Sequence, residues 1–118
     1  MSQLKKILAR KEERKKKLAR ALSSAVAQLK GWGAEKIILF GSSSRGDIDT
    51  HSDLDILVIM PEQKTGKEWM RYIYENIEKD VASDILAYNE PEFEENLPKS
   101  SFLSTIVKSG RVVYEKTT

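Results

Sequence analysis

The amino-acid sequence predicts an α/β (α+β) domain built from a small mixed β-sheet that is covered by helices. Short apolar runs typical of buried strands alternate along the chain with longer segments of helical periodicity. Hydrophobic residues make up 40% of the 118 residues, which is enough for one core of useful size. Neither an internal repeat nor a low-complexity linker is visible, so we expect a single domain.

The first predicted element is a helix over residues 3–30, where apolar residues recur at steps of four and three. Lys11 and Lys15 fall on the same stripe and interrupt it. We therefore divide the chain into a basic N-terminal helical extension, residues 1–17, and a folded domain, residues 18–118. The extension is expected to project, while the second half of the helix packs on the domain.

Four short apolar runs, bounded by polar or turn-forming residues, are predicted to be strands. We expect them at residues 36–40, 54–60, 81–88 and 112–114. Between the first two strands, a turn or short helix is expected at residues 42–46 and a polar loop at residues 47–52.

The remaining segments have helical character. We expect a helix at residues 64–79, a short acidic helix or loop at residues 90–96, and a helix at residues 100–109. The last helix is expected to end at Gly110. Its inward side chains are predicted to be Phe102, Leu103, Ile106 and Val107.

Charge is distributed unevenly along the chain. The formal net charge is +2, but residues 1–30 hold ten Lys and Arg against two Glu. The rest of the chain holds ten basic against sixteen acidic residues, so the body is acidic. Such a body favours a metal site over general binding of polyanions, and we do not expect nucleic acid as a partner.

The composition and the distribution of apolar residues exclude several features. The chain has no cysteine, so disulfides and thiolate metal sites are impossible. The longest apolar run, at residues 56–60, is far too short to span a membrane. The lysine-rich start lacks the apolar core of a signal peptide. We therefore expect a soluble cytoplasmic protein.

The most informative stretch pairs a Gly-Ser turn with two aspartates. Gly41 and Ser42 precede Asp53 and Asp55, which open the apolar run of the second strand. Alternate residues of a strand face the same side, so both carboxylates are aimed at one place, where a divalent cation would offset their repulsion. A Gly-Ser turn offers N–H groups and a hydroxyl to an anion. This is the layout of a phosphoryl- or nucleotidyl-transfer site.

The same stretch resembles the signature of the minimal nucleotidyltransferases, the smallest members of the DNA polymerase beta-like superfamily. The resemblance lies in FGSSSRG at residues 40–46 and SDLDILV at residues 52–58. In that family a later strand supplies a third carboxylate, and Asp84 within VASDILA at residues 81–87 is the match. Where many relatives carry a basic residue this chain has Ser43, which leaves Arg45 as the nearest basic candidate for the triphosphate.

The resemblance implies a polymerase beta palm-like fold and an Mg²⁺-dependent transfer of a nucleoside monophosphate, AMP from ATP. Asp53, Asp55 and Asp84 would be the catalytic and metal-binding residues for two ions. Gly41, Ser42 and Arg45 would bind the nucleotide.

Minimal nucleotidyltransferases are typically encoded beside a small helical HEPN partner, and some act as antitoxins of type VII-like toxin–antitoxin systems. These antitoxins AMPylate a tyrosine of the toxin. The resemblance therefore also implies a HEPN-type partner, and a homo-oligomer remains open.

Two other phosphate and metal motifs fail on spacing. A P-loop would need Lys and Ser or Thr after Gly46, where Asp47 and Ile48 stand. An EF-hand beginning at Asp47 would need Gly and Glu where Ser52 and Val58 stand.

Plainer interpretations also stay open. The two aspartates of the second strand could simply be solvated at the end of a loop, and Asp84 could face water from an edge strand. Alternative functions are a nucleotidyltransferase for small molecules such as aminoglycosides, and a non-catalytic antitoxin that acts by binding.

Overall fold

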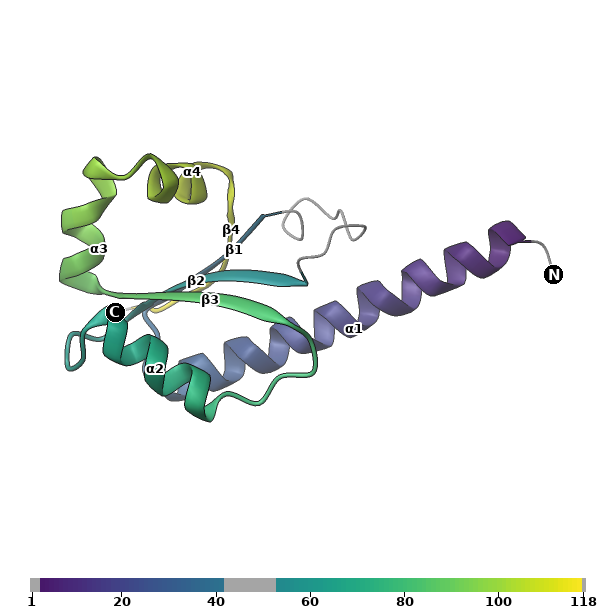
Figure 1. The fold of residues 1–118 in the computed structure, drawn as a ribbon, viewed down its shortest axis with the longest axis horizontal. Coiled ribbons are helices and arrows are strands. Elements are labelled where there is room, and N and C mark those ends of the chain that lie inside the picture. The colour runs from purple at the N-terminus through teal and green to yellow at the C-terminus, as the bar shows by residue number, and fades with distance from the viewer. Residues whose placement is uncertain (1–2, 42–52, 118) are drawn as a thin grey trace.

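The structure is a computed structural model, and it describes residues 3–41 and 53–117 (Figure 1). Within those residues the chain forms one four-stranded sheet and the helices that cover it. In chain order the elements are α1 (Gln3–Gly31), β1 (Lys36–Phe40), β2 (Leu54–Met60), α2 (Gly66–Asn76), β3 (Ser83–Asn89), α3 (Glu90–Asn96), the 3₁₀ helix η2 (Leu97–Lys99), α4 (Ser101–Ser109) and β4 (Arg111–Glu115).

The sheet has the order β3-β2-β1-β4 and is mixed, as the sequence predicts. β1 pairs antiparallel with both β2 and β4, while β2 and β3 run parallel. The crossover between the two parallel strands is α2, because parallel neighbours cannot be joined by a tight turn. β3 and β4 are therefore the two edge strands of the sheet.

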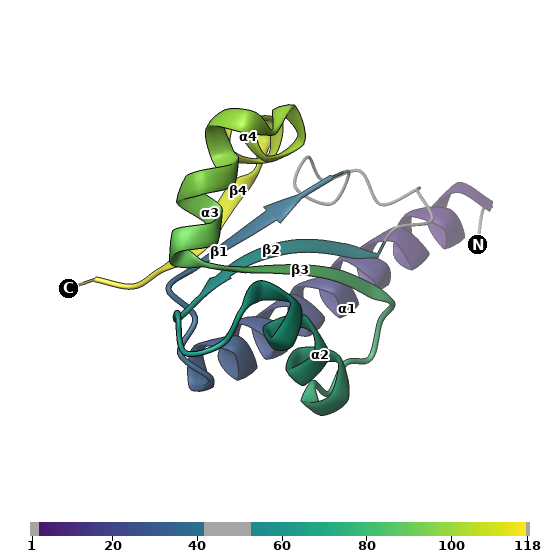
Figure 2. The ribbon, with the colours of Figure 1, turned by 60° about the vertical axis from the view of Figure 1, so that its left-hand side comes forward.

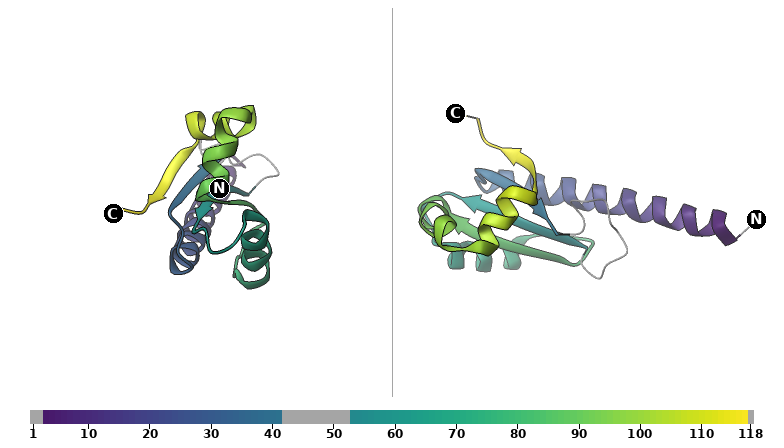
Figure 3. Two further views of the ribbon diagram at one scale, coloured as in Figure 1. Left: turned by 90° about the vertical axis from the view of Figure 1, so that its left-hand side faces the viewer. Right: turned by 90° about the horizontal axis from the view of Figure 1, so that it is seen from above.

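Helices cover both faces of the sheet, with α1 and α2 on one side and α3 and α4 on the other (Figures 1 and 3). The larger core lies on the first side and includes Leu29, Ile37, Ile56, Trp69 and Ile73. The smaller core lies beneath α4 and is formed by Ile38, Leu57, Leu103 and Ile106. Successive side chains of a strand point alternately to these two cores, so the core that a residue joins shows which face of the sheet it lies on.

Helix α1 is one unbroken helix, but only its C-terminal half packs on the sheet. Ala25 and Leu29 are buried, whereas Leu4, Ile7 and Leu8 are 64%, 45% and 53% exposed. The N-terminal half projects beyond the sheet (Figure 1). The division of the chain at residue 17 stays a prediction, because the helix itself continues through it.

Helix α2 begins with a capping box and ends three residues before the predicted end. The side chain of Thr65 accepts a hydrogen bond from the Glu68 N–H, and the Glu68 carboxylate accepts one from the Thr65 N–H. At the other end, Ile77 is extended, and the side chain of Gln28 on α1 bonds both backbone groups of Glu78. This contact with α1 replaces a further helical turn, which periodicity alone could not predict.

Segment 90–96, predicted as a short helix or a loop, is a helix. Asn89 caps α3 and forms a capping box with Glu92. The same Glu92 carboxylate also accepts a hydrogen bond of 2.7 Å from the Gly66 N–H. One carboxylate therefore ties the starts of α2 and α3 together.

The prediction for the last helix was half wrong. Leu103 and Ile106 are buried as expected, but Phe102 and Val107 are 53% and 40% exposed. With nine residues, α4 presents only a narrow stripe to the sheet, and its flanking apolar residues fall outside that stripe. Gly110 caps the helix with φ −77°, where a Cβ would lie only 2.5 Å from the carbonyl oxygen of Ile106. Lack of space therefore explains this glycine.

None of the helices in the described part of the chain is long and apolar enough to cross a membrane.

Candidate active site

The strand directions bring three predicted positions to one edge of the sheet. β1 ends there, and β2 and β3 both begin there (Figure 2). In the register of the sheet, Phe40 is the partner of Asp55, and Asp55 is the partner of Asp84. Residues that are far apart in the sequence thus form a single row across three strands.

The row lies on the face of the sheet that α4 covers. Two residues further into each strand, Ile38 and Leu57 belong to the core beneath α4, and Leu86 packs against that core. Since alternate residues of a strand share a face, Phe40, Asp55 and Asp84 project to that same side. The structure therefore brings Asp55 and Asp84 together as neighbours on parallel strands.

Gly41 makes room for the Asp55 carboxylate. Its φ is +74°, a conformation that favours glycine, and a Cβ at this residue would lie 2.5 Å from Asp55 Oδ2. The carboxylate thus lies against the backbone where β1 ends. The glycine that the sequence assigned to nucleotide binding is also the residue that admits the acid.

Asp84 lies near the start of the edge strand β3 and is exposed, whereas Asp55 on the inner strand is half-buried. The edge position agrees with the plainer interpretation in which the carboxylate faces water. It also leaves this end of the row open to a large molecule.

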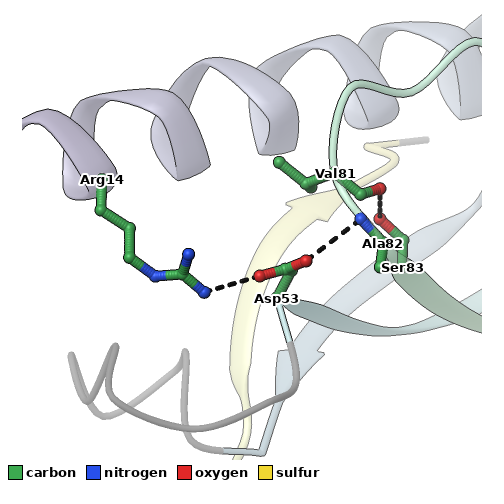
Figure 4. Close-up of polar contacts among 5 residues, drawn as sticks. All are labelled: Arg14, Asp53, Val81, Ala82 and Ser83. Atoms are coloured by element: carbon green, nitrogen blue, oxygen red, sulfur yellow. Dashed lines mark hydrogen bonds and ion pairs between the residues drawn. The ribbon is translucent and has the colours of Figure 1, made fainter.

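Asp53 has a different environment from Asp55. It precedes β2, so the alternation of side chains along the strand does not fix the direction of its carboxylate. One carboxylate oxygen accepts a hydrogen bond from Arg14 of α1 at 2.6 Å (Figure 4). The other accepts one of 3.2 Å from the N–H of Ala82, just before β3. Asp53 therefore joins α1 to the start of β3.

Arg14 is the site residue that sequence reasoning missed. It lies 39 residues before its partner and carries no local motif, so only the packing of α1 could reveal it. Its side chain is 42% exposed and that of Asp53 is 21% exposed, so solvent screens the ion pair in part.

Carboxylate oxygens are the ligands that Mg²⁺ prefers, and Asp55 and Asp84 supply them from adjacent strands. These two residues fit a divalent cation in chemistry and in placement, while Asp53 is engaged by Arg14. Within residues 3–41 and 53–117, no three His, Cys, Asp or Glu side chains are grouped as a metal site. Ser42 and Arg45, predicted to bind the nucleotide, lie outside the described residues.

A cavity of about 390 Å³ lies at the opposite end of the sheet and contains none of the three aspartates. Glu35 and Glu90 line it, together with Phe93. Burial, followed by a hydrogen bond and charge repulsion from Glu90, raises the pKa of the Glu35 carboxyl.

Residues 15–113 match the protein family described as a nucleotidyltransferase domain. This chain is a nucleotidyltransferase. The match spans most of the sequence and confirms the resemblance noticed at residues 40–46 and 52–58. It begins inside α1, so it leaves out most of the predicted N-terminal extension.

Individual proteins also resemble this nucleotidyltransferase. A protein of Methanocaldococcus jannaschii named "Putative protein adenylyltransferase" is 34% identical over 76 residues, which cover 64% of this chain and 75% of that protein. The crystal structure of a "putative nucleotidyltransferase" from Sulfolobus solfataricus has a TM-score of 0.63 and 19% identity. The alignment covers 90% of this chain and 87% of that one, and it supports the fold class alone.

Proposed function

We propose that this nucleotidyltransferase transfers AMP from ATP to a hydroxyl group of a partner protein, and that Asp53, Asp55 and Asp84 are its catalytic residues. The observation that carries the proposal is the row in which Asp84 and Asp55 are strand partners beside Gly41. The name of the Methanocaldococcus jannaschii relative supports a protein as the acceptor.

The openness of the site supports the same kind of acceptor. Asp84 is exposed on an edge strand, and nearly all of the described chain is used for the sheet and its covering helices. Little of the described chain remains to enclose a small acceptor. A partner protein could bring its own surface to this edge. By the family resemblance, we propose a tyrosine of a HEPN-type helical protein, with this chain as the antitoxin.

In the proposed reaction the acceptor oxygen forms a bond to the α-phosphorus of ATP, and the bond from that phosphorus to the bridging oxygen breaks. Pyrophosphate leaves with the electron pair. Asp84, at the open end of the row, orients the hydroxyl and accepts its proton. Gly41 and Ser42 hold the β- and γ-phosphates through backbone N–H groups, and Arg45 offsets their charge.

We propose that Asp55 and Asp84 hold Mg²⁺, and that Asp53 joins them when its carboxylate leaves Arg14. Bound ions would neutralise charge on the α-phosphate and on the leaving pyrophosphate. The contribution of the chain itself is positioning, because adjacent strands fix the spacing of Asp55 and Asp84.

The test is label transfer with purified protein, Mg²⁺ and the protein encoded by the adjacent open reading frame. ATP labelled at the α-phosphate should label that partner, whereas ATP labelled at the γ-phosphate should not. Label on small hydroxyl compounds such as aminoglycosides, without any protein partner, would instead support a small-molecule enzyme. A stable complex that never carries label would support a non-catalytic antitoxin.

A further inference from the structure

The ring of Phe102 lies half-exposed next to the row of acids. It belongs to α4, whose neighbouring residue Leu103 is fully packed in the core, yet 53% of Phe102 is exposed. Its ring meets that of Phe40 edge to face, with centroids 6.1 Å apart and an interplanar angle of 89°. Phe40 is itself only partly buried. The two rings therefore form an aromatic pair that is not fully buried in the core.

The aromatic pair has a defined place in the site. Phe40 is the last residue of β1, directly before Gly41, and it is the strand partner of Asp55. Asp84 lies on the other side of Asp55. Across the sheet edge the order is therefore Asp84, Asp55 and Phe40, and Phe102 of α4 contacts the Phe40 end. One end of this row is charged and open, and the other end is aromatic.

A nucleoside triphosphate matches this division. Its phosphates need cations and N–H groups, and its base offers a flat ring that stacks on aromatic side chains. We propose that Phe102, supported by Phe40, contacts the nucleobase or its sugar and so binds the nucleotide rather than the acceptor. This inference rests on the proposed function. It assigns the two ends of the row to the two substrates, with the acceptor beside Asp84.

The chemistry of phenylalanine sets the expected selectivity. A phenyl ring has no donor or acceptor that could read the edge of a base. Phe102 therefore contributes affinity for every nucleotide and little discrimination among bases. Removing the ring should weaken ATP and GTP binding by the same factor, and it should leave the binding of a ligand without a base unchanged.

The experiment compares Phe102→Ala with Phe102→Trp and with Val107→Ala in the full-length protein. Val107 is a matched control because it is an apolar residue on the same helix, is 40% exposed, and has no ring to stack on a base. Dissociation constants are measured with Mg²⁺ for ATP, GTP and inorganic tripolyphosphate. Thermal unfolding of each variant checks that it folds.

We expect Phe102→Ala to weaken ATP and GTP binding by about tenfold or more, the usual loss for one stacking contact. Tripolyphosphate binding should stay the same, Phe102→Trp should retain nucleotide affinity, and Val107→Ala should behave as wild type. Equal loss of tripolyphosphate and ATP binding would overturn the inference, as would unchanged ATP affinity. A wild-type protein that binds neither ligand would instead overturn the proposed function, which keeps the two failures distinct.

Discussion

The carboxylate of Asp55 lies directly over Gly41, so that a Cβ at residue 41 would come within 2.5 Å of Asp55 Oδ2. Gly41 also has φ +74°, where residues with a side chain are strained by roughly 1–2 kcal/mol. We therefore expect Gly41→Ala to lower the free energy of unfolding by at least about 1 kcal/mol. It should also displace the Asp55 carboxylate. The rate of AMP transfer should therefore fall even under conditions where the variant is fully folded. Urea unfolding and label transfer measure the two effects.

Gly31→Ala is the matched control for this substitution. A Cβ at Gly31 would meet nothing within 4 Å, and this glycine ends α1 far from the acids. Stability and activity should both stay close to wild type. Full activity in Gly41→Ala would show that the close approach of Asp55 to the backbone has no part in the reaction.

The strand pairing of Asp55 with Asp84 makes both acids testable with isosteric amides. Asp84→Asn should lower AMP transfer by on the order of 10²–10⁴-fold, the range for a lost acid–base group. Asp55→Asn should also lower AMP transfer, because it removes a carboxylate that would hold Mg²⁺. Neither should destabilise the fold by more than about 0.5 kcal/mol, since both side chains reach the surface. Asp80→Asn, an exposed acid outside the strands, is the control. Undiminished transfer by Asp84→Asn would remove this residue from the site.

Substitutions at the Arg14–Asp53 ion pair can distinguish the structural role of Asp53 from its proposed catalytic role. Arg14→Gln should reduce stability by no more than about 1 kcal/mol, because the pair is partly exposed, and the loss should shrink at high salt. Under the proposed function, AMP transfer should persist in Arg14→Gln, since the Asp53 carboxylate is then released to the site. Transfer should fail in Asp53→Asn. If Arg14→Gln is folded but inactive, Asp53 works while held by Arg14, and its proposed move to the metal is wrong.

The sheet could be predicted from the sequence because each strand is a short apolar run with clear turn residues on both sides. Strands β1 and β2 have the predicted bounds, and β3 and β4 shift only by one or two residues at their ends. What could not be predicted is the register. The pairing of Asp55 with Asp84 depends on which strands become neighbours, and no local pattern encodes it.

Side-chain partners across long sequence distances explain the other differences. Gln28 binds the backbone of Glu78, where α2 has already ended, and Arg14 binds Asp53. Both residues lie on α1, and the periodicity of α1 says nothing about contacts with other segments of the chain. Phe102 was predicted to face inward because an apolar residue in a short helix looks like core. Its exposure is visible only once α4 is placed over β1.

Asn89 holds the opposite end of the sheet and should matter for stability alone. It is 9% exposed, caps α3 through Glu92, and donates a hydrogen bond of 3.1 Å to the Lys64 carbonyl. Asn89→Ala should lower the free energy of unfolding by about 2 kcal/mol, combining a lost cap with a buried hydrogen bond. Urea unfolding measures this. The control is Asn76→Ala, which loses a single exposed bond at the end of α2 and should cost less than about 0.5 kcal/mol.

Glu35 gives the protein a stability term that depends on pH. Burial raises the pKa of its carboxyl, helped by the hydrogen bond and charge of Glu90 and by Glu62, and opposed by Lys116. A group whose pKa is raised in the folded state stabilises the fold below its ordinary pKa, and this stabilisation is lost as pH rises through the folded value. The ionised Glu35 is therefore unfavourable at neutral pH. The other charged groups lining the cavity are Lys36, Glu94 and Glu115.

We expect Glu35→Gln to be more stable than wild type at pH 7, because the amide stays neutral and can still bond to Glu90. The advantage should shrink as pH falls and disappear below about pH 4, where the wild-type carboxyl is protonated in both states. Urea unfolding of both proteins across this range measures the difference. Glu78→Gln, at an exposed residue outside the cavity, should show no such trend. A Glu35→Gln variant that is less stable at pH 7 would mean that the carboxylate is held by a favourable contact, for which the charge of Lys116 is the candidate.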